Sequence, residues 1–295
     1  MSSNRTSTVT LSLFTAATIW GLIWYPYRII DHAGINGVVA SMVTYAFAFL
    51  LGLAVLRRKL RGARFSWWLP LIALAAGGCN LGYVLAVLGG DVMRVLLLFY
   101  LSPLWTVLLA RLLLGERLNP LGMAVIGLSL CGAMVMLWHP AMGIPWPRCV
   151  AEWIGMGAGF MFALNNVLIR RTGELSIELK SMASFVGVIV SGALMLPWIT
   201  LPSPTVMTAG LFFLMLLIGV VLLAVNLVIQ YGLTQVKANR AIVILLFELV
   251  VAALASWLLA GEYMGIREWA GGALIILASL FSGHMEEDEP QSGNA

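Results

Sequence analysis

Leu112-Leu113-Leu114-Gly115-Glu116 returns 146 residues later, slightly changed, as Leu258-Leu259-Ala260-Gly261-Glu262 in this chain of 295 residues. The distance between the two copies is half the length of the protein. At the same offset Arg94 falls on Arg240, and the sequence around these positions is strongly apolar. A long apolar sequence that repeats itself once predicts a duplicated membrane protein.

The composition places the chain in a lipid bilayer. Its hydrophobic fraction is 61%, its charged fraction is 10% and its mean hydropathy is +0.97, whereas about a quarter of the residues of soluble proteins are charged. Continuous apolar runs such as 95–114 do not alternate in polarity, which argues against a membrane β-barrel. Runs of the roughly 20 residues that a membrane-crossing helix needs predict an all-α protein with ten transmembrane helices, at 9–27, 37–56, 67–88, 93–113, 121–138, 151–169, 182–201, 208–230, 241–260 and 269–285.

Basic residues predict how the bundle sits in the membrane, because short loops rich in Lys and Arg stay on the cytoplasmic side. If the N-terminus is cytoplasmic, 13 of the 17 basic residues fall inside, and Arg28, Arg94, Arg148 and Arg267 fall outside. Both termini are therefore expected in the cytoplasm. Each half has five spans, so the second half is expected to enter the membrane from the opposite side, as an inverted repeat around a central cavity.

The chain divides into four predicted parts: a first five-helix repeat (1–138), a proline-rich linker (139–148), a second, inverted five-helix repeat (149–285) and an acidic cytosolic tail (286–295). Pro140, Pro145 and Pro147 prevent the linker from being helical throughout. The start of the chain lacks the basic region of a cleavable signal, so the first span is expected to serve as an uncleaved signal anchor.

The sequence shows no constellation of catalytic or metal-binding residues. Cys79, Cys131 and Cys149 are scattered and form no Cys-x-x-Cys pair, which argues against a disulfide framework and against a metal site. The sequence contains no His-Glu-x-x-His motif, no nucleophile elbow and no phosphate-binding loop for ATP. A protein that is not an enzyme, and that needs no cofactor and no metal, is predicted.

Glu248 is the ionisable residue predicted to lie deepest in the bilayer. It follows Arg240 by eight residues, which at about 1.5 Å per residue places it about 12 Å into its span. A charge at this depth costs several kcal/mol unless it is paired or hydrated, so it marks a candidate site. Its carboxylate could bind a substrate ammonium group or carry a proton, or it could be a hydrogen-bonded pin between helices.

Amides and aromatic residues inside the spans complete the candidate substrate site. Amides offer donors and acceptors to a zwitterion, although they also serve as hydrogen bonds between helices. Aromatic rings could cradle an apolar side chain of the substrate, or they could belong to ordinary packing. Asn80 and Asn226 fall at equivalent positions of the two halves. The substrate-binding candidates are Trp20, Trp24, Asn80, Tyr83, Tyr100, Ser102, Trp105, Asn165, Asn166, Asn226, Gln230 and Glu248.

Helix breakers and glycines are expected to supply gating movement or close packing. Pro26 and Pro103 lie within or at the end of predicted spans and free backbone carbonyls there, which makes them candidate hinges. Gly155-x-x-x-Gly159 permits close contact between helices.

These features resemble the drug/metabolite transporter superfamily, and specifically its EamA-type exporters. The resemblance rests on the duplicated ten-span plan, on Trp20-Gly21 in the first span, on Ser102-Pro103, and on the paired Gly-Glu endings at 115–116 and 261–262. It covers nearly the whole chain. The aromatic-rich first half is most similar to bacterial exporters of aromatic and other neutral amino acids.

The resemblance implies a basket-like bundle in which spans 1, 3, 4, 6, 8 and 9 surround a central cavity, while spans 5 and 10 lie at the periphery. The substrate-binding candidates all fall on those six spans. The family often has Glu-Pro where this chain has Glu248-Leu249. The ninth span is therefore expected to bend less than the fourth, which keeps Pro103.

The expected function is secondary export of neutral, aromatic or other apolar amino acids, or of related metabolites, across the bacterial inner membrane by alternating access. The expected partners are a small-molecule substrate and the lipid bilayer, without nucleic acid, and a monomer is the expected working unit. A carrier of nucleotide sugars or phosphorylated metabolites is an alternative, but it should show deep Arg or Lys, whereas the basic residues here fall at span ends. A non-transporting membrane scaffold or sensor is a second alternative.

Overall fold

The computed structural model describes residues 3–61, 65–144, 146–203, 206–261 and 263–286, and in these ranges the chain is helical without strands. The first half contains α1 (Ser3–His32), α2 (Gly37–Leu60), α3 (Trp68–Gly89), α4 (Val92–Phe99), α5 (Ser102–Leu114) and α6 (Pro120–Leu137). The second half contains α7 (Val150–Arg171), α8 (Ile177–Met195), α9 (Ala209–Gln235), α10 (Ala238–Leu245), α11 (Phe247–Ala260) and α12 (Ile266–Phe281). Short 3-10 helices are η1 (Pro140–Met142), η2 (Leu196–Trp198) and η4 (Ser282–Glu286).

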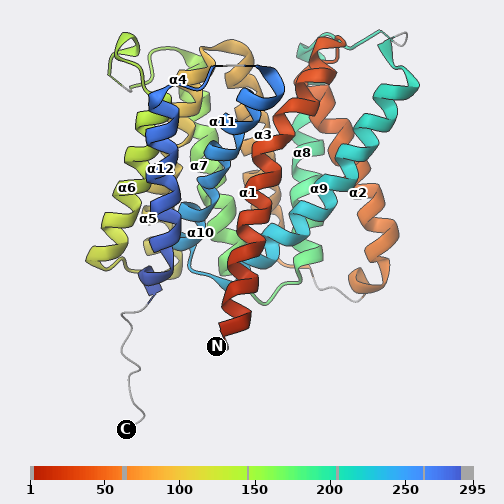
Figure 1. Cartoon of the computed structure of the whole chain (residues 1–295). Coiled ribbons are helices and arrows are strands. Elements are labelled where there is room, and N and C mark those ends of the chain that lie inside the picture. The colour runs from red at the N-terminus through yellow and green to blue at the C-terminus, as the bar shows by residue number, and fades with distance from the viewer. Residues whose placement is uncertain (1–2, 62–64, 145, 204–205, 262, 287–295) are drawn as a thin grey trace.

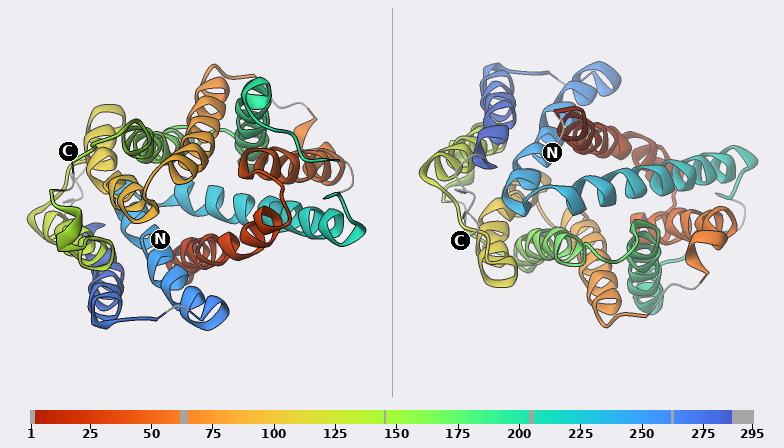
Figure 2. Two further views of the ribbon diagram at one scale, coloured as in Figure 1. Left: turned by 90° about the horizontal axis from the view of Figure 1, so that it is seen from above. Right: turned by 90° about the horizontal axis from the view of Figure 1, so that it is seen from below.

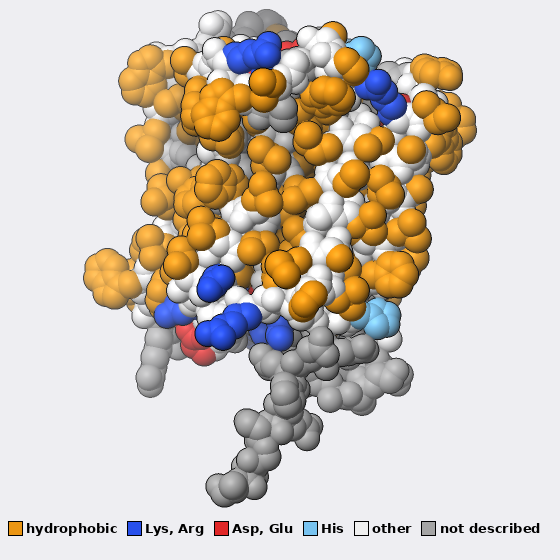
Figure 3. Space-filling model, turned by 90° about the vertical axis from the view of Figure 1, so that its left-hand side faces the viewer, with side chains coloured by type: hydrophobic (Ala, Val, Ile, Leu, Met, Phe, Trp, Pro, Cys, Tyr) orange, Lys and Arg blue, Asp and Glu red, His pale blue; other side chains and the backbone are white. Residues whose placement is uncertain are grey.

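Among the described residues, eight helical segments are long and apolar enough to cross a membrane. They coincide with eight of the predicted spans; α4 with α5 forms the segment Val92–Leu114, and α10 with α11 forms Ala238–Ala260. The other two predicted spans coincide with α7, whose glycines and adjacent asparagines lower its hydropathy, and with α12, which has 16 residues. Figure 3 shows an apolar band between two ends that carry the charged side chains, as in an integral membrane protein with several spanning helices.

The helices form a bundle in which α1 begins and η4 ends at the same end (Figure 1). We call this the near end, and we call the opposite end, where α4 begins at Val92, the far end. Seen along the helices, α6 and α12 pair on one side, and α2 and α8 pair on the other (Figure 2). Between them α3 packs against α7 and α8, and α9 packs against α1 and α2.

The repeated Leu-Leu-x-Gly-Glu stretches end two helices in the same way. Gly115 ends α5 with a φ of 69°, and Gly261 ends α11 with a φ of 67°. Their backbone N–H groups donate to the carbonyls of Ala110 and Ser256, respectively. Glycine is favoured in this left-handed conformation because it has no Cβ to clash with the backbone. The repeated glycines are therefore helix stops.

Two spanning segments are interrupted near their middle, at equivalent positions of the halves. The first is broken at Tyr100 and Leu101, between α4 and α5, and the second at Leu246, between α10 and α11. Pro103 accounts for the first break, because it has no N–H to donate to the carbonyl of Phe99. The second break occurs without a proline and is one residue long instead of two. Proline is therefore not required to interrupt the ninth predicted span.

The linker between the halves contains the turn η1. Close to it, the indole Nε1 of Trp138 donates to the carbonyl oxygen of Gly143 at 2.8 Å. Pro145 of the predicted linker, the repeated Glu262 and residues 287–295 of the predicted acidic tail lie outside the described residues.

Candidate functional site

The two helix breaks are joined by a hydrogen bond that links the halves of the chain. Tyr100, at the first break, is buried, and its Oη donates to Oε1 of Glu248 at 2.9 Å. Glu248 is the second residue of α11 and lies in the middle of the segment Ala238–Ala260. A carboxyl group at this depth needs a polar partner. The structure thus brings together two of the predicted site residues, 148 positions apart in the sequence, at mid-height of the bundle.

Aromatic rings pack around this pair. Tyr83 of α3 lies edge-on to Phe99 with 5.3 Å between the ring centroids, and Phe99 lies 5.2 Å from Tyr100. Phe162 of α7 is 5.5 Å from Phe99, and Phe247 packs against the same cluster. Sequence analysis selects Tyr83 but misses the three phenylalanines. A phenylalanine at the site and one that faces lipid look the same in a hydropathy pattern.

Each break rests against a glycine of a neighbouring helix. A Cβ on Gly159 of α7 would lie 2.4 Å from the carbonyl oxygen of Phe99, and a Cβ on Gly21 of α1 would lie 2.7 Å from that of Glu248. Both distances are shorter than side-chain contacts allow. Glycine at these two positions allows α7 and α1 to contact the backbone at the breaks. This close packing determines the positions of Tyr100 and Glu248.

Three predicted amides each have one buried side-chain atom without a hydrogen-bond partner among the described residues. The atoms are Oδ1 of Asn165, Nδ2 of Asn166 and Oε1 of Gln230. Each unpartnered buried polar atom costs about 1–3 kcal/mol, so a ligand or water is expected to satisfy them. Asn226, in contrast, donates from Nδ2 to the carbonyl oxygen of Leu222 in its own helix, at 3.1 Å.

Ser102 and Pro103 follow the first helix break directly, whereas Asn80 lies on α3. Ser102 begins α5 directly after the break; its hydroxyl is buried and has no partner in the described part of the chain. Pro103, a predicted hinge, is buried in the first turn of α5. Asn80 is half-buried on α3, one helical turn from Tyr83.

Trp105 lies at the interface between α5 and α7. Its ring is edge-on to that of Phe160, with 5.5 Å between the centroids, and its Nε1 is buried without a partner among the described atoms. Trp105 also lines an apolar groove of about 250 Å³ together with Leu101, Leu104 and Leu108. Leu104 and Leu108 are exposed, so this groove faces the lipid.

The candidates on α1 engage residues of their own region. Trp24 lies edge-on to Tyr25 at 5.6 Å, and the guanidinium of Arg28 lies 5.8 Å from the centroid of the Trp24 ring. Pro26 lies inside α1, which continues through it, and it lines an apolar groove of about 290 Å³ between α1 and α9. Trp20 packs against the buried core. In the described part of the chain no ring contact joins these tryptophans to Tyr100.

Glu116, from the repeated stretch, caps a helix at the near end. Its carboxylate oxygens accept from the backbone N–H of Ala238, the first residue of α10, at 3.0 and 3.2 Å, and Oε1 lies 3.8 Å from Nε of Arg170. A negative charge is favourable at a helix N-terminus. Burial nevertheless raises the pKa of Glu116, against the opposing effects of the Ala238 hydrogen bond and the Arg170 charge. Glu116 ties α5 to α7 and α10.

We expect Glu116→Ala to lower thermal stability, because it leaves the N–H of Ala238 without its acceptor, at a cost of about 1–3 kcal/mol. Glu116→Gln keeps an acceptor and should be tolerated at pH 7. The folded state binds the Glu116 proton more tightly than the unfolded state, so this carboxyl favours folding most at acid pH and least above its raised pKa. Apparent melting midpoints measured in detergent at pH 7 and at acid pH test this prediction. The control is Glu174→Gln, at an exposed position. Equal losses of stability in Glu116→Ala and Glu116→Gln would contradict it.

Known proteins are similar to this chain in sequence and in fold. A model of the EamA-like transporter family matches residues 8–138 and again residues 150–283. The riboflavin transporter of Rhizobium johnstonii is 31% identical over 252 residues, which are 82% of this chain and 79% of that protein. Protein RarD of Salmonella typhi is 26% identical over 145 residues, which are 47% of this chain and 49% of that one.

A solved crystal structure superposes on this chain with a TM-score of 0.76, covering 93% of this chain and 96% of that one. Its identity of 19% shows a shared fold alone. The family model matches both halves, and the relative from Rhizobium johnstonii aligns over most of its length. The chain therefore belongs to the EamA-like transporter family, within the drug/metabolite transporter superfamily, and is a membrane transporter.

Proposed function

We propose that this transporter exports neutral amino acids or related metabolites across the bacterial inner membrane. It works by alternating access of two inverted five-helix halves, and both termini lie in the cytoplasm. Transport needs no cofactor, and one copy of the chain is sufficient.

The inverted arrangement is supported by correspondences between the halves. The family model matches twice, at 8–138 and at 150–283, and the helix stops Gly115 and Gly261 share one geometry. When the halves are exchanged, the packing of α3 on α7 and α8 corresponds to the packing of α9 on α1 and α2. Reciprocal contacts of this kind are expected when two repeats enclose one site.

The observation that carries the proposal is the hydrogen bond between Tyr100 and Glu248. It joins the breaks of both halves at mid-height, where alternating access places the substrate site. Broken helices in transporters leave backbone groups and polar side chains available at this depth. A movement of α4 relative to α11 must stretch or release this bond, so substrate binding here would act on both halves.

The buried polar atoms support a neutral or zwitterionic substrate. Asn166 offers a donor, while Asn165 and Gln230 offer acceptors, all without partners among the described residues. The carboxylate of Glu248 provides the negative charge that an ammonium group would need. Tyr83 and Tyr100, with the phenylalanines around them, provide aromatic surface for an apolar side chain.

A riboflavin-like heteroaromatic solute is a second candidate substrate. The relative that covers 82% of this chain is named as a riboflavin transporter. The same aromatic cluster and neutral amides would suit a planar, uncharged ring system.

A phosphorylated substrate has less support, because the buried basic residues engage protein groups near the ends of the bundle. Lys180 donates to the carbonyl oxygens of Ile169 and Thr172 and to Oγ1 of Thr234, at 2.7–3.3 Å. Arg94 is bonded to Glu152. These groups hold helices together at positions away from the Tyr100–Glu248 pair.

Counterflow into proteoliposomes tests the proposal. Vesicles loaded with one unlabelled solute receive the same labelled solute outside, across a panel of neutral and charged amino acids, riboflavin and a sugar phosphate. We expect accumulation with neutral amino acids and none in protein-free vesicles. Accumulation only with riboflavin would favour the second candidate. Accumulation only with the sugar phosphate, or with no solute, would overturn both.

A further inference from the structure

The far end of the bundle is closed by a buried ion pair. Arg94, in the first turn of α4, and Glu152, in the first turn of α7, are only 9% and 5% exposed. Nε of Arg94 donates to Oε1 of Glu152 at 2.7 Å, and an Nη donates to Oε2 at 3.0 Å. This bidentate geometry gives a strong and specific pairing between a guanidinium and a carboxylate.

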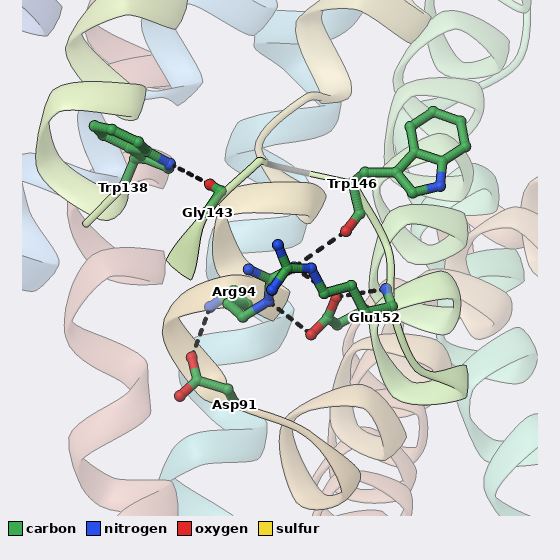
Figure 4. A network of polar contacts seen from close by, with 7 residues as sticks. Asp91, Arg94, Trp138, Gly143, Trp146 and Glu152 are labelled. Carbon is green, nitrogen blue, oxygen red and sulfur yellow. Dashed lines mark hydrogen bonds and ion pairs between the residues drawn. The ribbon is translucent and has the colours of Figure 1, made fainter. Parts of the chain in front are cut away.

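The linker between the halves is tied to the same pair, as Figure 4 shows. The carbonyl oxygen of Trp146 accepts from Arg94 at 3.1 Å, and the backbone N–H of Arg148 donates to Oε2 of Glu152 at 2.9 Å. Oδ1 of Asp91 accepts from the backbone N–H of Arg94 at 3.0 Å and caps α4. One buried cluster therefore fastens α4, the linker and α7 together.

The equivalent arginine of the second half lies at the near end. Arg240 follows Arg94 by 146 residues and lies in the first turn of α10, as Arg94 lies in that of α4. Its Nη donates to the hydroxyl of Thr10 on α1 at 2.9 Å. The hydrogen bond to a neutral group is the weaker of the two contacts.

The half-helix α4 connects the ion pair directly to the candidate site. Arg94 lies in its first turn, and its last residue, Phe99, precedes Tyr100 at the break. Along this length α7 packs tightly against it, since a Cβ on Gly155 would lie 3.0 Å from Val95. Movement of α4 away from α7 is therefore the movement that would open the far end to Tyr100, and it separates Arg94 from Glu152.

We propose that Arg94 and Glu152, with the Trp146 carbonyl and the Arg148 N–H, form a latch. This latch must open before the central site becomes accessible from the far end of the bundle. We call this cluster the far-end latch. The inference rests on the proposed alternating access. Removing the carboxylate should leave Arg94 buried without its counter-ion, which favours the open arrangement.

Cys79 provides a natural reporter of this opening. It is half-buried on α3 and packs with Tyr83 against the cluster that contains Tyr100. The other two thiols, Cys131 and Cys149, are exposed and can be replaced by serine, which at position 149 keeps a donor beside Glu152 in place of the thiol. A membrane-impermeant maleimide would then label Cys79 alone, applied to spheroplasts and to inverted vesicles. A protease-accessible C-terminal tag identifies the membrane side of the near end.

In this background we expect Glu152→Gln to speed labelling of Cys79 from the far-end side about tenfold or more, as the loss of a buried ion pair shifts the population toward the open state. The control is Glu178→Gln, which breaks the Lys59–Glu178 pair of 2.7 Å at the near end. It should leave far-end labelling unchanged. The double variant Arg94→Gln/Glu152→Gln contains no unpaired charge and should also speed labelling, even if the single variant is unstable.

Unchanged labelling in both the single and the double variant would overturn the latch, as would an equal increase in Glu178→Gln. An increase from the near-end side alone would also overturn it. This measurement requires no transported solute. If the protein transports no amino acid but Glu152→Gln still speeds labelling from the far end, the latch is supported and the proposed substrate is rejected.

Discussion

Glu248→Gln should reduce amino-acid transport by about 10- to 100-fold, which is the largest functional effect that we expect from a single substitution. Hydrogen bonds to a charged group contribute roughly 1.5–3 kcal/mol. If substrate binding loses that much free energy, the transport rate falls by about 10- to 100-fold. Glutamine retains the shape of the side chain and an oxygen that can accept from Tyr100. The variant therefore removes the charge while it preserves the packing at the second helix break.

Two transport measurements separate the roles that Glu248 can have. If the carboxylate binds a substrate ammonium group, both counterflow and uptake driven by a pH gradient should fall. If it carries a proton, pH-driven uptake should be lost while counterflow persists. If it is only a pin between helices, transport should survive and the melting midpoint should drop, which would contradict the expected result.

Tyr100→Phe removes the donor to Glu248 and leaves the ring, so it should reduce transport less than Glu248→Gln does. Its matched control is Tyr27→Phe, which removes a 2.6 Å hydrogen bond to Thr44 elsewhere in the bundle. A similar loss in both tyrosine variants would show that any buried hydroxyl matters, rather than the one that joins the breaks.

Gly159→Ala should lower stability by about 1–3 kcal/mol, because overpacking a tight interface forces the backbone apart. The new methyl group would lie 2.4 Å from the carbonyl oxygen of Phe99. Backbone cannot move aside as a flexible side chain can. We therefore expect α7 to shift away from the first helix break, displacing Tyr100 from Glu248. The melting midpoint in detergent and the counterflow rate should fall together.

Gly157→Ala is the matched control for this prediction. Gly157 lies on the same helix two residues away, and nothing lies within 4 Å of a Cβ built on it. Alanine is favoured over glycine in a helix by roughly 1 kcal/mol. This variant should keep or slightly raise the melting midpoint and should transport normally. Equal behaviour of the two variants would contradict the close seating of α7 on Phe99.

Local sequence patterns predicted the helical segments, of which eight among the described residues are long and apolar enough to span a membrane, but they did not predict that two of these segments are each divided into two helices. Apolar runs marked the spans because the backbone of a chain in lipid must satisfy its hydrogen bonds within each segment. The repeat marked equivalent positions of the two halves, and the structure shows that its glycines, Gly115 and Gly261, end two helices in the same way. The depth of Glu248 followed from counting residues along a helix, and it lies in the middle of its segment.

Hydropathy was less informative about which side of each helix meets another. The lipid and the protein interior are similarly apolar, so no alternation separates the faces of a membrane helix. Trp105 and Tyr100 were selected by the same criteria, yet the ring of Trp105 lies against Phe160 whereas the hydroxyl of Tyr100 reaches Glu248. Glu152 was missed because it stands at a predicted span end, where a charged residue is ordinary.

The sequence alone determined that this is a duplicated, all-helical membrane protein with a carboxyl group in the middle of a long apolar segment, because length, apolarity and spacing act within single helices. Only the tertiary structure decided that Tyr100 meets Glu248 and that Arg94 meets Glu152, pairs separated by 148 and 58 positions. Such pairs depend on how the helices are rotated and on where glycines let them approach, as Gly159 does at Phe99. The repeat that relates the two halves indicates where to look, and packing selects the side chains that touch.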